Sequence, residues 1–355
     1  MKILVLTPYF HPHLGGSERY IEELYGELMR QNKNVNVDVL TYNTNQSSKL
    51  ERYRGFNIYR VGCWEILPGQ FALPNYLELY QLLKKLKANQ YDLVNAHTRF
   101  FDTAWWGFLA AKYLGAKSIL TDHCASHPQH KNAVVKLIAK LIDLLLMPLL
   151  SKVYDQITVV SQATKDFWIK QIGNAGKIAV ITNSVSESLL IDKKPKNSKI
   201  SVRFIGRNIA AKGASFFDQV AKELKPLYKE VVFERVGGVS HQRVMDLLQQ
   251  TTIFVHPSTH HEGLPTILLE AGLASCAVVA TNVGGTREII KDGVSGLLVE
   301  PTDESVKAGI ESLLRNQDKA KMMSSKLKER ILGKYLWKQT AKKYERLLVS
   351  LVKKS

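Results

Sequence analysis

The sequence predicts an α/β protein of two domains, and three observations support this prediction. Short β-branched or aliphatic runs alternate with longer amphipathic runs, a pattern typical of parallel strands joined by helices. With 355 residues and 45% hydrophobic content, the chain is long enough to form two separate cores. The alternation weakens after Val185 and begins again at Ser201. We therefore expect two parallel-sheet domains joined by a linker.

The domain boundaries follow from that interruption. Residues 192–199 are polar and charged and include Pro195, a composition typical of an exposed inter-domain segment. The predicted organisation is a first domain over residues 1–190, a linker over 191–200, a second domain over 201–335 and a C-terminal helix over 336–355. The strands expected from the aliphatic runs cover residues 3–6, 35–40, 93–95, 118–120, 156–160, 179–181, 201–205, 231–233, 252–255, 277–280 and 296–299.

Charge and cysteine content limit the classes of function. The 49 Lys and Arg residues exceed the 32 Asp and Glu residues, giving a net charge of +17 that attracts phosphates, nucleic acids or anionic lipid. No nucleic-acid-binding motif accompanies this charge, so we expect no nucleic-acid partner. The three cysteines are too far apart to form a disulfide framework or a zinc pattern. A reducing cytoplasm fits this usage.

Two apolar segments resemble a signal peptide or a transmembrane helix. Residues 1–7 run directly into Pro8 without a small-residue cleavage site, so we expect a first buried strand rather than a signal peptide. Residues 134–150 are the most hydrophobic stretch, but Lys136, Lys140 and Asp143 interrupt it. Because such charges are costly at the centre of a bilayer, we expect no transmembrane helix.

The same stretch leaves two interpretations open. Residues 131–152 form an apolar helical run with several lysines, and Lys84, Lys85 and Lys87 add positive charge upstream. Such a run rests on an anionic membrane surface in some proteins. It is equally typical of a core helix with a solvated face.

Gly15 and Gly16 follow the first predicted strand and precede a helical run. Two glycines let the backbone approach a ligand closely, and Ser17 as N-cap would leave amide donors at the positive end of the helix. A diphosphate fits such a site. The alternative is an ordinary tight turn.

Arg207 ends the first predicted strand of the second domain, and Lys212 follows five residues later. Open α/β sheets bind ligands at the carboxyl edge, where two cations can offset phosphate charge that grows as a glycosidic bond breaks. The alternative is a pair of solvated surface cations.

The most specific signal is a pair of carboxylates, Glu262 and Glu270, separated by seven residues. Pro265 suits the first turn of a helix, which places Glu262 in the preceding loop and Glu270 within an apolar helix. A buried carboxylate needs a partner, and two ribose hydroxyls are a natural one. The loop amides of Gly263 and Leu264 would face phosphate. The alternative is that both carboxylates are exposed surface charges.

Three histidines, His256, His260 and His261, suggest a metal site. However, their spacing matches no zinc pattern, and the sequence contains no Asp-x-Asp pair. We therefore expect no bound metal.

The Glu262–Glu270 element, together with the preceding Pro257 and Ser258, resembles the signature of family-4 retaining glycosyltransferases of the GT-B fold. The resemblance covers nearly the whole chain. Further similar elements are Gly15-Gly16-Ser17-Glu18-Arg19, Val160-Ser161, Gly206-Arg207, Lys212-Gly213, Val283-Gly284-Gly285 with Glu288, Asp292-Gly293 with Gly296, and the segment 337–348.

The resemblance implies two Rossmann-like domains facing across a cleft, with a C-terminal helix that crosses back to the first domain. It implies transfer of a sugar from a UDP-, GDP- or dTDP-sugar to a sugar or lipid-linked acceptor, with retained anomeric configuration. The product would belong to cell-surface polysaccharide, lipopolysaccharide or glycolipid synthesis. The resemblance implies no cofactor and no metal, and a cytoplasmic enzyme, peripheral at the inner face of the membrane if the membrane interpretation holds.

The resemblance also implies roles for single residues. The diphosphate would be held by the amides of Gly15 and Gly16 and by Arg207 and Lys212. Glu270 would bind the ribose and Glu262 the donor sugar, and His123 matches the family's cleft histidine. The chain departs from the family between Lys212 and Thr252, which leaves the loop 236–240 with Val239 as the expected contact for the nucleobase. His97 is either an acceptor-side residue or a buried hydrogen-bonded histidine.

Two rival functions remain beside glycosyl transfer. One is a nucleotide-sugar epimerase of similar build, and the other is a sugar-nucleotide-binding protein without catalysis. The intact set of Glu262, Arg207, Lys212 and Glu270 argues against loss of catalysis.

Overall fold

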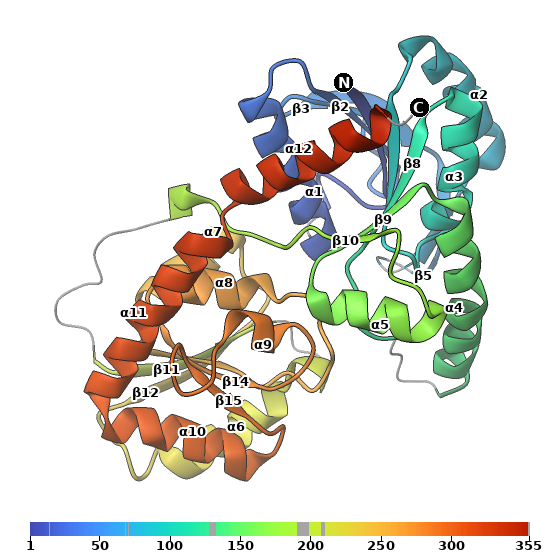
Figure 1. Cartoon of the computed structure of the whole chain (residues 1–355). Helices are drawn as coiled ribbons and strands as arrows, with labels where there is room; N and C mark the ends of the chain where they lie inside the picture. Colours follow the sequence, from blue (N-terminus) through green and yellow to red (C-terminus); the bar gives the residue numbers. More distant parts are fainter. Residues whose placement is uncertain are drawn as a thin grey trace. The chain divides into compact units, whose positions relative to one another are not determined.

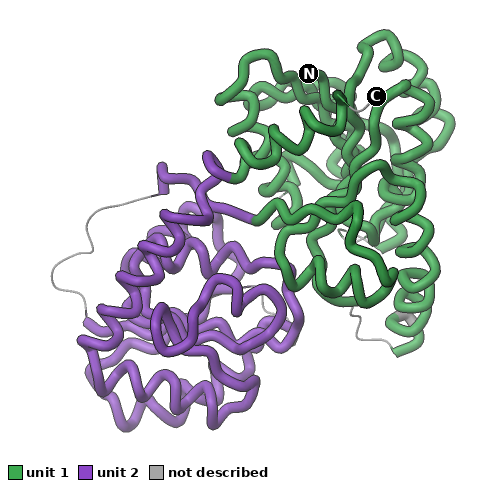
Figure 2. Tube along the Cα trace, in the orientation of Figure 1, with its two compact units in different colours: residues 1–182, 340–355 green, residues 183–339 purple. Residues whose placement is uncertain are grey.

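A computed structural model describes residues 1–13, 15–67, 69, 71–127, 133–189, 199–206 and 210–353 (Figure 1). The chain divides into unit 1, made of Met1–Thr182 and Thr340–Ser355, and unit 2, made of Asn183–Gln339 (Figure 2). This division precedes the linker predicted over 191–200, most of which lies outside the described residues.

Unit 1 is built on a sheet in the order β10-β9-β8-β7-β1-β2-β4-β3, in which only the β3–β4 pair is antiparallel. The central strands β1, β7 and β8 are almost entirely buried, as expected for parallel strands with helices on both faces of the sheet. The strands are β1 (Lys2–Leu6), β2 (Asn36–Tyr42), β3 (Leu50–Tyr53), β4 (Phe56–Val61), β7 (Leu93–His97), β8 (Lys117–Asp122), β9 (Gln156–Val159) and β10 (Ile178–Val180), and β5 (Cys63–Leu67) and β6 (Phe71–Pro74) form a separate antiparallel pair.

The helices of unit 1 lie on opposite faces of this sheet. The chain steps from β7 to β8, β9 and β10 in one direction, and from β1 to β2 in the other. Because crossovers between parallel strands are right-handed, the helices of the two series cover opposite faces. The helices are α1 (Gly16–Gln31), α2 (Tyr76–Leu86), α3 (Asp102–Leu114), α4 (Ala133–Val153), α5 (Gln162–Ile172) and α12 (Trp337–Val352), with short turns η1 (Lys87–Asn89) and, in unit 2, η2 (Glu187–Leu189).

Unit 2 contains a fully parallel sheet in the order β12-β11-β13-β14-β15. Its core includes Phe204 and Val255 from the sheet, which pack with Phe217 and Ile310 from the helices on one face. The elements are β11 (Ser201–Ile205), η3 (Ala210–Lys212), α6 (Ala214–Leu224), β12 (Val232–Val236), α7 (His241–Gln249), β13 (Ile253–His256), α8 (Thr266–Leu273), β14 (Ala277–Thr281), α9 (Thr286–Ile289), β15 (Leu297–Val299), α10 (Asp303–Arg315) and α11 (Gln317–Lys334).

The C-terminal helix α12 belongs to both units. It begins at Trp337 in unit 2, and from Thr340 onward its residues belong to unit 1. There the Tyr344 hydroxyl lies 3.1 Å from the Tyr25 hydroxyl of α1. The predicted α/β class with two parallel-sheet domains and a returning C-terminal helix is therefore confirmed.

Candidate active site

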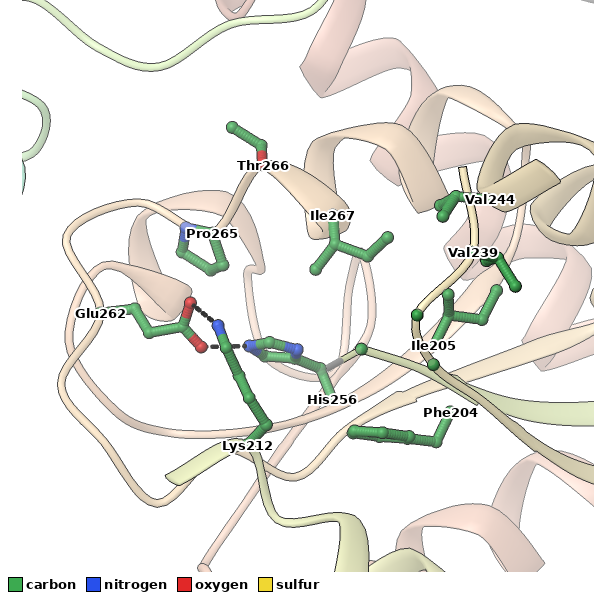
Figure 3. A pocket seen from close by; sticks show the side chains of 13 residues that line it. Phe204, Ile205, Lys212, Val239, Val244, His256, Glu262, Pro265, Thr266 and Ile267 are labelled. Atoms are coloured by element: carbon green, nitrogen blue, oxygen red, sulfur yellow. Dashed lines mark hydrogen bonds and ion pairs between the residues drawn. The ribbon is translucent and has the colours of Figure 1, made fainter. Parts of the chain in front are cut away.

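Unit 2 contains a pocket of ≈ 310 Å³ where β11, β12 and β13 end (Figure 3). The carboxyl ends of parallel strands meet at one edge of a sheet, and loops leaving that edge form ligand sites. The pocket is lined by Phe204, Ile205, Gly206, Lys212, Gly237, Gly238, Val239, Val244, His256, Glu262, Pro265, Thr266 and Ile267.

Lys212 is placed in the pocket by a tight contact between two loops. The next residue, Gly213, has φ +71° and precedes α6. A Cβ atom there would overlap the carbonyl of Pro257, so only glycine fits. The Ser258 hydroxyl donates to the Ala211 carbonyl at 2.9 Å, which joins η3 to the loop that follows β13. The backbone on both sides of Lys212 is therefore fixed.

Glu262 contacts two nitrogen-bearing side chains, one at each carboxylate oxygen (Figure 3). Lys212 Nζ donates to Glu262 Oε2, and His256 Nε2 lies 3.1 Å from Glu262 Oε1. Burial alone would raise the pKa of the Glu262 carboxyl, but His256 and Lys212 outweigh it and hold that pKa well below its usual range. The carboxylate is thus ionised at neutral pH and fixed in orientation.

A glycine pair brings the Glu262 loop close to the β14–α9 loop. Gly285 N donates to the Glu262 carbonyl at 3.0 Å. Cβ atoms at Gly284, which has φ +53°, and at Gly285 would overlap the backbone of Glu262 and Gly263 respectively. The loop can take its position only because both residues lack a side chain.

The opposite wall of the pocket is apolar. It is formed by Ile205, Val239, Val244 and Ile267 (Figure 3). The loop that carries Val239 turns at Gly238, which has φ +68°. One wall therefore suits an apolar ring and the other a charged or hydroxyl-rich group.

Three further predicted residues of unit 2, Gly263, Leu264 and Glu270, are described by the structure but are not among the residues that line this pocket. Glu270 is buried on α8, and its Oε1 lies 3.0 Å from His241 Nε2 at the start of α7. The Leu264 carbonyl accepts a hydrogen bond of 2.7 Å from Asn183 Nδ2, and Gly263 packs against Gly285. Arg207 lies outside the described residues. The ligand roles of these residues stay predictions.

At the glycine turn of unit 1 the structure corrects one expectation. The N-cap of α1 is Gly15, in an extended conformation, so the prediction that Ser17 caps the helix was wrong. Ser17 lies inside the first turn, where its hydroxyl donates to Glu18 at 2.9 Å. The Glu18 carboxylate folds over Gly15 and accepts from His13 Nδ1 at 2.7 Å, while the space beside Gly16 is open. A diphosphate at Gly15 would require Glu18 to move.

His123 and His97 form a pair at the carboxyl edge of the unit 1 sheet. His97 Nδ1 lies 3.2 Å from His123 Nε2, and the Tyr20 ring packs edge-on against His123 with 4.9 Å between centroids. Burial lowers the pKa of His123 to about 4 and that of His97 well below its usual range. Both imidazoles are therefore neutral at pH 7, and one donates a hydrogen bond to the other.

Sequence reasoning missed the role of His256. It considered this residue only as a metal ligand, although His256 ends β13 at the same sheet edge as Gly206. Its position at the end of a buried strand is the signal that could have identified it. Among the described residues no three His, Cys, Asp or Glu side chains are arranged to hold a metal ion. Metal independence stays a prediction.

Comparisons with known proteins identify a family for both parts of the chain. A model described as Glycosyltransferase Family 4 matches residues 14–189, and one described as Glycosyl transferases group 1 matches residues 187–330. The chain is 26% identical to an uncharacterized glycosyltransferase of Methanocaldococcus jannaschii over 99% of both chains. It is 24% identical to a phosphatidylinositol N-acetylglucosaminyltransferase chain of Arabidopsis thaliana, over 97% of this chain and 81% of that one.

Solved structures show the same fold. Sucrose-phosphate synthase of Thermosynechococcus elongatus superposes with a TM-score of 0.75 at 17% identity, covering 100% of both chains. The Anabaena protein HepE in complex with UDP-glucose superposes with a TM-score of 0.74 at 16% identity, covering 99% of this chain and 100% of that one.

Proposed function

Because the chain belongs to the group 1 glycosyltransferases of the GT-B fold, we propose that it transfers a sugar from a nucleoside-diphosphate donor to an acceptor hydroxyl, retaining the anomeric configuration. The observation that carries this proposal is the unit 2 pocket. A fixed cluster of Lys212, Glu262 and His256 forms one wall, and an apolar wall opposes it.

The two walls match the two ends of a sugar nucleotide. The nucleobase lies against Ile205 and Val239, and the β-phosphate and sugar lie towards Lys212 and Glu262. Stacking and apolar contacts suit a heterocyclic ring, whereas a lysine stabilises phosphate charge. This assignment keeps Val239 as the nucleobase contact expected from the sequence.

The reaction breaks the bond between the anomeric carbon and the β-phosphate oxygen and forms a bond to the acceptor oxygen. The acceptor proton passes to the departing phosphate, so the products are a glycoside and a nucleoside diphosphate. Negative charge grows on the leaving group as the bond breaks. Lys212, which lines the pocket, supplies a positive charge that stabilises it. Arg207 is proposed for the same task from its position in the sequence.

Glu262 positions the donor sugar. An ionised carboxylate accepts hydrogen bonds from sugar hydroxyls, and its low pKa keeps it an acceptor throughout the working pH range. His256 holds the carboxylate in orientation. In unit 1, His123 is proposed as an acceptor-side group and the Gly15 and Gly16 amides as phosphate contacts. Glu270 is proposed as the ribose ligand.

A UDP-sugar is the first donor to test, because HepE, which shares the fold, binds UDP-glucose. The curated relative from Arabidopsis transfers N-acetylglucosamine to phosphatidylinositol by its name. We accordingly propose a glycan or glycolipid acceptor carried on lipid and presented at the cytoplasmic face of a membrane. No metal or cofactor is proposed for the transfer.

The test combines donor binding with product analysis. UDP-, GDP- and dTDP-sugars are each screened by thermal shift and by release of nucleoside diphosphate. One class of donor should raise the melting temperature and be consumed, and the anomeric proton of the product should keep the donor's configuration in NMR spectra. Inverted product would refute retention. Interconversion of the sugar nucleotide without transfer would identify an epimerase, and binding without turnover would identify a non-catalytic protein.

A further inference from the structure

Helix α4 of unit 1 is apolar on the side that faces away from the core. Its buried residues, Ala139, Met147 and Leu150, form one stripe. At about 100° per residue, Leu141 and Leu145 lie on the opposite side, and Leu145 is 77% exposed. The exposed large apolar side chains of α4 are Val134, Leu137, Ile138, Leu141, Ile142, Leu144, Leu145 and Leu149.

A buried ion cluster fixes the rotation of α4. Asp143 is 3% exposed and accepts from Arg99 Nε at 2.8 Å, and His127 Nδ1 lies 2.6 Å from its other oxygen. Arg99 also pairs with the buried Asp122. Turning the apolar side inward would break this cluster, at the cost of exposing or unpairing buried charges. The outward apolar face is therefore a stable property of the fold.

The exposed charges carried by α2, α3 and α4 are positive. Exposed lysines on α4, on α3 and at the C-terminal end of α2 are Lys136, Lys140, Lys152, Lys112, Lys84, Lys85 and Lys87. The acidic residues on the described parts of these three helices are Glu78, which is partly buried and paired with Lys49, and the buried Asp102 and Asp143. These helices thus present no fully exposed carboxylate.

Helices α2 and α3 also carry exposed apolar side chains. α3 packs with both α2 and α4. A groove of ≈ 280 Å³ between α2 and α3 is lined entirely by apolar and aromatic side chains, namely Tyr76, Leu79, Tyr80, Leu83, Trp106, Leu109, Ala110 and Tyr113. Leu77 and Tyr80 of α2 and Leu109 of α3 are also exposed. No helix in the described ranges is both long and apolar enough to span a membrane.

An outward helix face is ordinarily polar, and a large exposed apolar patch marks a binding surface. A symmetric dimer through this face would bring the same lysines together, whereas an anionic bilayer supplies both an apolar layer and negative charge. We propose that the outward face of α4, with the lysines of α2, α3 and α4, docks on an anionic membrane surface with α4 lying in the interfacial zone. This proposal rests on the proposed function in that a lipid-linked acceptor would be reached there.

The test is cosedimentation of the full-length protein with vesicles of phosphatidylcholine, with and without phosphatidylglycerol, at several salt concentrations. Wild type should bind anionic vesicles at low salt and lose binding as salt rises. The Leu141→Gln/Leu145→Gln variant should bind on the order of tenfold more weakly because the apolar contact is lost. Lys136→Gln/Lys140→Gln should reduce binding to anionic vesicles on a similar scale.

Matched controls lie on unit 2. Leu227 is 67% exposed, and Lys225 and Lys229 repeat the spacing of Lys136 and Lys140. Leu227→Gln and Lys225→Gln/Lys229→Gln should bind as wild type does. The proposal would be overturned if the control variants lost as much vesicle binding as the α4 variants, or if wild type did not bind anionic vesicles at low salt. A dimer in sedimentation velocity that Leu141→Gln/Leu145→Gln dissociates would also overturn it.

Release of nucleoside diphosphate from the donor in the absence of membranes separates the two proposals. The α4 variants should keep the wild-type rate in that assay. If no donor is consumed by any protein while the vesicle results hold, the proposed function fails and the docking surface stands.

Discussion

His256 Nε2 lies 3.1 Å from Glu262 Oε1, while Lys212 Nζ donates to the other carboxylate oxygen, Oε2. This contact joins the end of the buried strand β13 to the loop that carries Glu262. It keeps Glu262 ionised despite burial, because two nitrogen-bearing groups offset the desolvation of one carboxylate. The Glu262 side chain is 17% exposed, and it is one of the residues that line the pocket.

Glu262→Ala should lower turnover by on the order of a hundredfold, as for other preorganised charged groups. The measurement is release of nucleoside diphosphate from the preferred donor under saturating conditions. Glu223→Ala, which removes a carboxylate from α6, should keep the wild-type rate. A Glu262→Ala enzyme with near-normal turnover would argue against any role for this carboxylate in holding the sugar.

His256→Asn should act through Glu262 rather than on the substrate directly. Without the imidazole, burial is opposed by Lys212 alone, so the pKa of Glu262 should rise. The acid limb of the pH profile of kcat/KM should then move to higher pH. If the activity falls by the same factor at every pH, His256 does not control the ionisation of Glu262.

The histidine pair predicts a loss of stability on mild acidification. The pKa of His123 is lowered from 6.5 to about 4 in the folded protein, so between these values the unfolded chain binds more protons. Folding stability should therefore be unaffected above pH 6.5 and fall by roughly 3 kcal/mol as the pH drops to 4. Urea unfolding of wild type and His123→Asn across this range tests the prediction. A variant with the same pH dependence as wild type would contradict it.

Gly213→Ala should destabilise unit 2 by more than about 2 kcal/mol, because φ is positive there and a Cβ overlaps the Pro257 carbonyl. Gly333→Ala is the matched control, since it lies in α11 with open space around it and should gain roughly 0.5–1 kcal/mol from helix propensity. Thermal unfolding compares the two. Equal stability of both variants would show that the η3 turn tolerates a side chain.

The sequence predicted the parts of the fold that depend on strongly buried strands. The runs at 93–95, 201–205 and 277–280 match β7, β11 and β14 to within two residues at each end. Residues 50–74 were missed, although they form β3 to β6. β3 is an edge strand with alternating exposure, and Arg54 and Gly55 turn it into β4 through positive φ values. Its half-exposed residues lack the continuous apolar pattern that marks interior strands.

Part of the site was predicted because some of its residues lie next to strands that the sequence identifies. Lys212, Glu262 and Val239 follow or flank identifiable strands, and they do line one pocket. The contribution of Gly284 and Gly285 depends on a contact with a loop far apart in the chain, which spacing does not reveal. His256 was missed although its place at the end of β13 is visible in the sequence. The prediction that Ser17 caps α1 was wrong because the extended backbone of Gly15 already begins the helix.

In the proposed reaction, Lys212 stabilises the departing nucleoside diphosphate in the unit 2 pocket. The most direct test is the rate of nucleoside diphosphate release by Lys212→Ala, with Lys225→Ala as a control for loss of one exposed lysine and with folding of both verified by thermal unfolding. Lys212→Ala should release nucleoside diphosphate on the order of a hundredfold more slowly than wild type, and Lys225→Ala should release it at the wild-type rate. Equal rates for the two folded variants would contradict this role of Lys212.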